Sequence, residues 1–301
     1  MTAGITAPGD ATSFGPCAGC GRSEGGRVVH EVWSTEPREP FSILACAVCG
    51  LLRTVPVPVD LDRYYRTAPG RWMREAPSPV FAAMQRIQLA REVRRVERLG
   101  SRQTILDVGA GAGLFARALR RRGHRVVTAD AGSAAPPATA GYGDIAHLRV
   151  DFDSGRVEGL PPDGYTVVLR HVLEHARDPA RLLAGLRRHG ARAFYVVVPN
   201  VACVERRLLG KSWFLWDPPR HLWHFDGGSL AALCRNAGLE VVRSGRDTIA
   251  NLGPSLYSAL ELRGWPRLAR PFAPRGALNA LTAPLNLLLP GNVIWVLAHC
   301  T

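Results

Sequence analysis

Apolar runs of strand length alternate with helix-like patterns between residues 104 and 245. The expected strands are Thr104–Val108, Arg125–Ala129, Leu148–Val150, Thr166–Leu169, Phe194–Val198 and Leu239–Arg243. The expected helices are Leu114–Arg122, Pro179–His189 and Ser229–Ala237, each followed by a glycine that stops it. This alternation, with strands that are apolar throughout, predicts an α/β fold in which helices cover both faces of a mostly parallel sheet.

Two further patterns flank this region. Apolar residues recur at helical spacing from Val80 to Leu99, behind the start signals Ser78 and Pro79. At the other end, the stretch between Arg275 and His299 is uncharged, but prolines and asparagines interrupt it. We therefore expect a short apolar helix, then a strand at Asn292–His299, and no stable membrane span.

The expected organisation has three parts. Residues 1–59 form an N-terminal unit, and residues 60–100 form a helical lid or linker. Residues 101–301 form the α/β domain, with an insertion at about 245–290. A length of 301 residues is consistent with two domains, and 47% apolar content excludes a disordered chain or a disulfide-held miniprotein.

The formal net charge is +13, but the basic residues are unusually uniform. Of the 38 Lys and Arg residues, only Lys211 is a lysine. Together with abundant Ala, Gly and Pro, this bias indicates GC-rich coding more than selection for a polyanionic partner. The charge alone is therefore weak evidence for nucleic-acid binding.

Four of the seven cysteines form two CxxCG turns, Cys17/Cys20 and Cys46/Cys49. Two residues between thiolates allow one tight turn to direct both sulfurs at one ion, and two such turns complete a tetrahedral shell around Zn²⁺. A closed shell of four thiolates predicts a structural zinc in a small zinc-ribbon-like unit. An odd number of cysteines and the absence of a signal-peptide pattern in residues 1–16 favour a cytoplasmic location.

A glycine-rich turn follows the first expected strand. Residues 104–115 read TILDVGAGAGLF, which places Asp107 and Gly109, Gly111 and Gly113 between a strand and a helix. The spacing fits neither the dinucleotide fingerprint nor a Walker loop. Asp130 ends the second strand, where a carboxylate is able to accept both hydroxyls of a ribose. The sequence therefore predicts a nucleoside site at this edge of the sheet.

On these residues the chain resembles the class I S-adenosylmethionine-dependent methyltransferases over about residues 80–245 and the final strand. The segments LRHVLEHARDPARLL, VVVPN and PPRHLWHF, and the preceding CxxC…CxxCGL, are similar to a large bacterial subgroup. The resemblance implies a doubly wound, mostly parallel, seven-stranded Rossmann-like sheet. It also implies S-adenosylmethionine as cofactor, held by Asp107, Gly109, Gly111, Gly113, Asp130, Asp151, Phe152 and the backbone of His171. The segment after Asp130 contains Pro136-Pro137, so we expect the family's second helix to be short or replaced by a loop.

Candidate catalytic residues follow the fourth expected strand. His171, Glu174 and His175 lie just past its carboxyl end, where open α/β sheets place ligands. His221 lies in a later aromatic segment that also contains His224. Methyl transfer requires alignment above all, and a base only where the acceptor carries a proton. We interpret His175 or His221 as that base, with Glu174 beside it; purely structural hydrogen-bonding roles for these histidines stay open.

Three functions compete. The leading hypothesis is transfer of a methyl group to a small-molecule or glycan acceptor. The runner-up is an RNA methyltransferase, favoured by two arginine clusters: Arg91, Arg94, Arg95 and Arg98, and Arg117, Arg120, Arg121 and Arg122. Residues 17–49, however, carry three arginines against four glutamates, and a unit that grips phosphates should be positive. The third is a scaffold that keeps the fold without catalysis, which an intact glycine turn and Asp130 disfavour.

Overall fold

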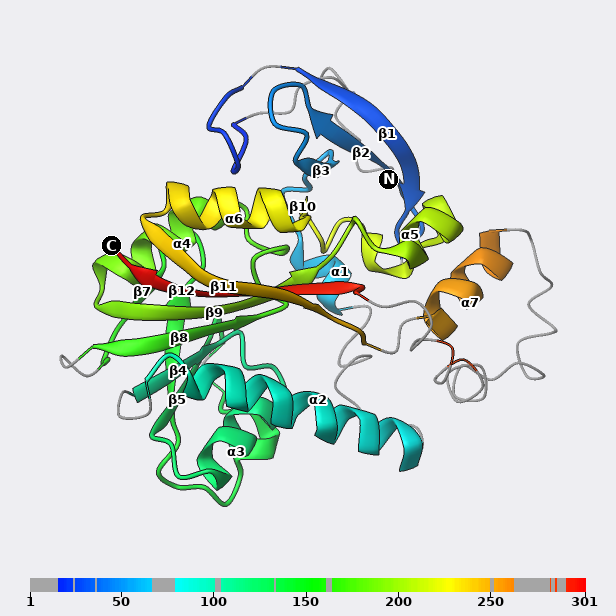
Figure 1. The fold of residues 1–301 in the computed structure, drawn as a ribbon. Coiled ribbons are helices and arrows are strands. Elements are labelled where there is room, and N and C mark those ends of the chain that lie inside the picture. The colour runs from blue at the N-terminus through cyan, green and yellow to red at the C-terminus, as the bar shows by residue number, and fades with distance from the viewer. Residues whose placement is uncertain are drawn as a thin grey trace, which may run out of the picture.

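The computed structural model describes residues 16–23, 25–35, 37–66, 79–100, 104–132, 134–160, 164–249, 252–262, 282, 285 and 291–301. In these residues the strands form two sheets, one of eight strands and one of four. Figure 1 shows the larger sheet between two layers of helices, with the smaller sheet above one of these layers.

The larger sheet has the strand order β11-β12-β9-β8-β4-β5-β6-β7. Its strands are β4 (Thr104–Val108), β5 (Val126–Asp130), β6 (Ala146–Asp151), β7 (Arg156–Val157), β8 (Tyr165–Arg170), β9 (Ala191–Pro199), β11 (Leu239–Asp247) and β12 (Val293–Cys300). The five strands from β9 to β6 are parallel, whereas β12 runs antiparallel to both β9 and β11. The mostly parallel methyltransferase sheet is thus confirmed. The count of seven strands was wrong, because the two-residue strand β7 folds back on the edge strand β6.

Helices cover both faces of this sheet (Figure 1). One face carries α4 (Pro179–Arg188) and α6 (Gly227–Asn236), and the other carries α2 (Pro79–Glu97) and α3 (Leu114–Arg121). The end of α2 packs Val93, Val96 and Leu99 against the sheet and α3. Between β5 and β6 only a single 3-10 turn forms, η1 (Pro137–Thr139), because Pro136-Pro137 prevent a longer helix. This matches the expected loss of the second helix.

The smaller sheet combines the N-terminal unit with a distant segment of the chain. Its order is β1 (Gly26–Trp33), β2 (Pro40–Cys46), β3 (Leu52–Val55) and β10 (Trp223–His224). Strand β10 pairs antiparallel with β3 and begins two residues after His221. The N-terminal unit is therefore joined to the larger domain by a shared sheet.

The remaining short elements lie near the carboxyl edge of the large sheet. They are α1 (Asp62–Arg66), α5 (Val204–Leu209), η2 (Gly210–Ser212), η3 (Phe214–Trp216) and α7 (Leu252–Leu262). Most of the insertion expected at 245–290 falls outside the described residues. In the described part of the chain, no helix combines the length and apolar character that crossing a bilayer requires.

Candidate functional site

The glycine-rich turn connects β4 to α3 in a conformation that favours glycine at three places. Gly109, Gly111 and Gly113 have φ values of 67°, 54° and 78°. A Cβ atom on Gly109 would lie 2.6 Å from Cγ2 of Val172, and one on Gly113 would lie 2.7 Å from Cβ of Pro136. The turn thus packs closely against the segment after β8 and the loop after β5, and neither Gly109 nor Gly113 has room for a side chain.

Asp107, the residue before the turn, is 2% exposed. Its Oδ2 atom has no hydrogen-bond partner. Burial raises the pKa of its carboxyl to about 7; Arg170 opposes this rise and Glu92 adds to it. An unpartnered buried carboxylate oxygen beside a turn of glycines and alanines fits the positive amino-acid end of S-adenosylmethionine.

A largely buried ion pair between Arg170 and Glu92 lies near Asp107. Arg170, the last residue of β8, donates from Nε to Oε2 of Glu92 on α2 at 2.5 Å, and Glu92 is 1% exposed. The Arg170 guanidinium also lies 4.6 Å from the ring centre of Phe115 on α3. Sequence analysis missed Glu92, although an acidic residue among Leu89, Val96 and Leu99 on an apolar helix face is a signal for such a pair.

The other expected cofactor residues lie at the ends of the next two strands. Asp130 ends β5, and its Oδ1 accepts a hydrogen bond of 2.8 Å from the backbone of Ala131. Asp151 ends β6, and its two oxygens accept hydrogen bonds from Asp153 N and Ser154 Oγ. Phe152 is half-buried against the core. Both oxygens of Asp151 are therefore engaged in its own turn, whereas the bond from Ala131 engages only one oxygen of Asp130.

The turn after β8 brings the expected catalytic residues together. His171 has a φ of 56°, and its Nδ1 lies 3.2 Å from Oε1 of Glu174. Glu174 is completely buried, and its Oε2 has no hydrogen-bond partner. His175 and His221 pack edge to face, with ring centres 4.7 Å apart. Residues 46 positions apart along the chain thus meet, and Val172 of the segment that carries His175 touches Gly109 of the glycine turn.

Hydrogen bonds from Thr54 and to Glu174 hold the segment of His221 in this position. Thr54 of β3 donates from Oγ1 to the carbonyl of His221 at 2.7 Å and also lies 2.8 Å from Nε2 of His224. The carbonyl of Glu174 accepts hydrogen bonds from the backbone N–H groups of Leu222 and Trp223. Sequence analysis missed Thr54, since no local pattern reports a contact across 167 residues.

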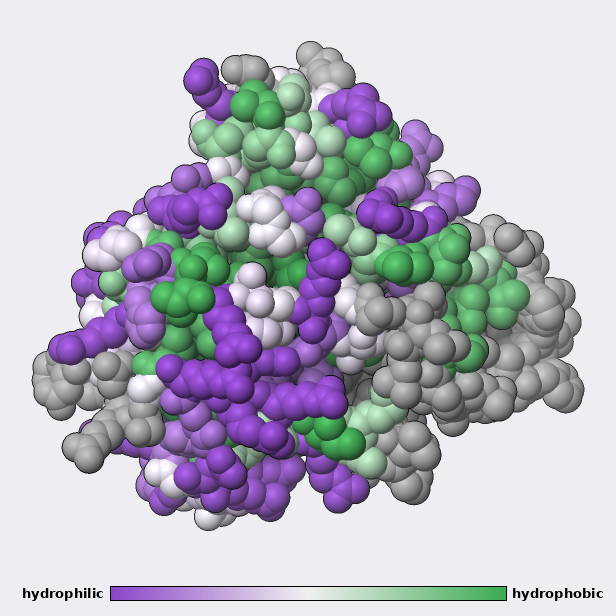
Figure 2. Space-filling model, viewed as in Figure 1, coloured by the Kyte–Doolittle hydropathy of each residue, from purple (hydrophilic) through white to green (hydrophobic). Residues whose placement is uncertain are grey.

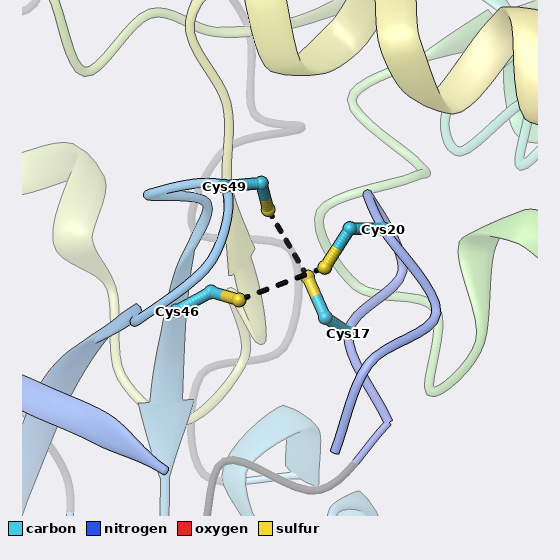
Figure 3. A group of neighbouring side chains, drawn as sticks. All are labelled: Cys17, Cys20, Cys46 and Cys49. Carbon is cyan, nitrogen blue, oxygen red and sulfur yellow. Dashed lines mark hydrogen bonds between the residues drawn. The ribbon is translucent and has the colours of Figure 1, made fainter. Parts of the chain in front are cut away.

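The four cysteines of the N-terminal unit converge, as Figure 3 shows. Sγ of Cys17 lies 3.4 Å from Sγ of Cys49, and Sγ of Cys20 lies 3.8 Å from Sγ of Cys46. A tetrahedral Zn²⁺ with bonds of about 2.3 Å separates its sulfurs by about 3.8 Å. The spacing and the chemistry of four thiols therefore fit a structural zinc.

The fold and site define the class: this is an S-adenosylmethionine-dependent methyltransferase with a Rossmann-like sheet. The comparisons agree. The chain belongs to the methyltransferase domain family, whose model matches residues 81–244.

Relatives and solved structures extend this assignment. The chain is 26% identical over 194 residues to the ubiquinone biosynthesis O-methyltransferases of Xanthomonas euvesicatoria and Xylella fastidiosa. These alignments cover 60% of this chain and 80% and 78% of the relatives. The fold is similar to 1,6-didemethyltoxoflavin-N1-methyltransferase of Burkholderia thailandensis, solved with its substrate and S-adenosylhomocysteine. That similarity has a TM-score of 0.50 and 16% identity, and covers 91% of this chain and all of that one.

Proposed function

We propose that this enzyme transfers the methyl group of S-adenosylmethionine to a hydroxyl of a small-molecule acceptor, free or borne on a glycan. The observation that carries the proposal is the cluster of Glu174, His175 and His221, whose first two residues belong to the segment after β8 that places Val172 against Gly109 of the glycine turn. The names of the relatives, which are O-methyltransferases of ubiquinone biosynthesis, support an oxygen acceptor on a small molecule.

For the cofactor, we propose that Asp107 faces its amino-acid end and that Asp130 accepts hydrogen bonds from the ribose hydroxyls. We propose that the backbone of Gly109, Gly111 and Gly113 lies against the cofactor between these two points. We propose that Asp151, Phe152 and the backbone of His171 complete the pocket. Support comes from the positive φ values of the three glycines and from the unpartnered oxygen of Asp107. Bound cofactor supplies an electrophilic methyl group on a sulfonium.

For the acceptor, we propose that the hydroxyl gives its proton to the imidazole of His175 or His221, beside Glu174. As the new O–C bond forms, the S–C bond breaks and its electron pair stays on the departing sulfur. The chain has to hold the acceptor oxygen in line with that bond, about 3–3.5 Å from the methyl carbon. His221 is bonded through Nδ1 to the carbonyl of Leu215, which lies in the same short segment as the buried, edge-to-face rings of Trp213 and Trp216.

We further propose that Cys17, Cys20, Cys46 and Cys49 bind a structural zinc in residues 1–59. Such a site contributes about 10–16 kcal/mol to the folding of a small unit. The thiols must stay reduced for this, which suits a cytoplasmic enzyme. Because β3 of this unit pairs with β10, the zinc would stabilise the loop that carries His221.

The alternative of an RNA substrate is weakened because several arginines of the two clusters form ion pairs within the protein. Arg95, Arg120 and Arg122 from the two clusters form ion pairs with Asp247, Asp144 and Glu97. Figure 2 shows hydrophilic residues over much of the surface that α2 and α3 form, which is an ordinary solvated helix layer.

The test is an assay with radiolabelled methyl donor on cell extract separated into RNA, protein and small-molecule fractions. We expect label in the small-molecule fraction and its loss with Asp130→Ala, whereas Asp153→Ala, on the exposed turn nearby, retains it. Label confined to RNA would overturn the proposal. Absence of S-adenosylhomocysteine binding in calorimetry would favour the non-catalytic scaffold.

A further inference from the structure

Glu174, His175 and His221 place one ligating atom each within 4.8 Å of the others. They come from two separate segments, the turn after β8 and the loop before β10. The carbonyl of Glu174 anchors the second segment by accepting the backbone N–H of Leu222 at 2.6 Å. The backbone hydrogen bond therefore fixes the two segments of the cluster relative to each other.

The hydrogen bonds of the two imidazoles determine which nitrogen faces the cluster. Nδ1 of His175 lies 2.9 Å from the carbonyl oxygen of Arg220, and Nδ1 of His221 lies 2.8 Å from that of Leu215. A carbonyl only accepts hydrogen bonds, so each Nδ1 carries the hydrogen and each neutral ring keeps a lone pair on Nε2. The hydroxyl of Tyr65, 3.0 Å from Nδ1 of His175, is then a second acceptor.

The carboxylate is oriented in the same manner. Nδ1 of His171 lies 3.2 Å from Oε1 of Glu174 and fixes that oxygen. The other oxygen, Oε2, is buried and has no hydrogen-bond partner. Each of the three side chains thus has one atom held by an outer partner and one acceptor atom left over, which is the arrangement of metal ligands and their supporting hydrogen bonds. Of these acceptor atoms, Nε2 of His221 also lies 3.9 Å from Oδ2 of Asp217.

We propose that Glu174 Oε2, His175 Nε2 and His221 Nε2 bind a divalent transition-metal ion with open coordination positions. Two imidazoles and one carboxylate favour Zn²⁺, Co²⁺, Ni²⁺ or Fe²⁺ over Mg²⁺ and Ca²⁺, which prefer oxygen ligands. Bonds of about 2.1 Å require ligand atoms about 3.4 Å apart, so the cluster needs to contract by little more than 1 Å. This site differs from the cysteine site, which has four thiolates and no open position.

The role of the ion rests on the proposed function. An ion bound by these residues would take the place of a histidine base. It would bind the acceptor oxygen at an open position and lower the pKa of its hydroxyl, whose proton would pass to solvent water. It would also fix the direction from which that oxygen approaches the methyl group. The acceptor class is then narrowed to molecules with a hydroxyl able to coordinate a metal, and a vicinal pair of hydroxyls would bind best because both fill open positions.

The experiment is a titration with Co²⁺ of the full chain carrying Zn²⁺ on its cysteines. We expect the wild type to bind one Co²⁺, with visible d–d bands, without thiolate-to-metal charge transfer, and with nitrogen and oxygen neighbours in X-ray absorption. Glu174→Gln and His221→Asn should bind it at least tenfold more weakly, whereas His189→Asn, at an exposed histidine, should bind as the wild type does. X-ray absorption on the wild type tests the ligand set even where a variant fails to fold.

Two results would overturn the inference. One is a wild type that binds no Co²⁺ beyond the cysteine site, which would leave a proton shared among the three groups. The other is equal Co²⁺ affinity in Glu174→Gln, His221→Asn and the wild type. Calorimetry with S-adenosylhomocysteine separates this inference from the proposed function. Cobalt bound without cofactor binding rejects the proposed function alone, whereas methyl transfer undiminished after removal of the labile metal rejects the metal role alone.

Discussion

Replacing Asp107 by Asn should stabilise the protein in the absence of cofactor, and more so at higher pH. In the folded chain, burial raises the pKa of this carboxyl from its ordinary 3.8 to about 7. Between these pH values the unfolded chain binds fewer protons than the folded one, so the free energy of unfolding falls as the pH rises and levels off above pH 7. The full effect is at most about 4 kcal/mol, of which about 3 kcal/mol develops between pH 5 and pH 8.5.

Urea unfolding of wild type and Asp107→Asn across pH 5 to 8.5 measures this difference. Because Asn cannot ionise, its contribution is independent of pH, and the gap between the two proteins should widen up to about pH 7. Asp153→Asn is the matched control, since that carboxyl is exposed. Parallel pH profiles for wild type and Asp107→Asn would refute the argument that burial raises the pKa of Asp107.

The raised pKa of Asp107 also predicts that cofactor binding releases a proton. A cationic amino group beside Asp107 favours the carboxylate, so binding should displace its proton. At pH 6, a group of pKa 7 is about nine-tenths protonated, and binding should release close to one proton. Calorimetry of S-adenosylhomocysteine in two buffers of different ionisation enthalpy counts that proton. If wild type and Asp107→Asn release equal numbers, Asp107 does not contact the charge of the cofactor.

Three further perturbations test other contacts. Gly109→Ala should weaken S-adenosylhomocysteine binding at least tenfold in calorimetry because its Cβ would meet Val172, whereas Gly123→Ala, also at positive φ but with open space, should cost only about 1–2 kcal/mol of unfolding free energy. Thr54→Val should destabilise the fold by about 1–3 kcal/mol and lower the methyl-transfer rate at least tenfold, and Thr54→Ser should restore both. Cys46→Ser should lower zinc content and melting temperature, unlike Cys300→Ser, whose hydroxyl keeps the bond to Ala191.

Local sequence patterns were sufficient to predict the parallel core. Strand β4 has the expected bounds, because the short run TILDV is followed directly by a glycine-rich turn. The absence of a long helix after β5 was also predictable, because its cause is local: two adjacent prolines interrupt the segment. Strand β7 was not predicted because two residues at an edge carry no detectable alternation.

The candidate site was only partly predictable for a different reason. Spacing identified the residues that follow β4, β5 and β8, since strand ends in a parallel sheet meet at one edge. It could not show that His221 reaches Glu174, because that meeting depends on β10 pairing with β3. Nor could it show that Arg170 and Glu92 pair, since the two residues are 78 positions apart.

The same pairing explains why an N-terminal cysteine unit accompanies this methyltransferase fold. The backbone of Thr54 donates to the carbonyl of Leu222, and the backbone of Leu222 donates to the carbonyl of Glu174. A continuous line of hydrogen bonds thus runs from β3 to the turn after β8. Loosening the cysteine unit would remove the bonds of Thr54 to this loop and leave it held by Glu174. In the proposed function, the unit would therefore act as a fixed wall of the reaction site. Its slight negative charge, which is unsuited to binding RNA, is compatible with that role.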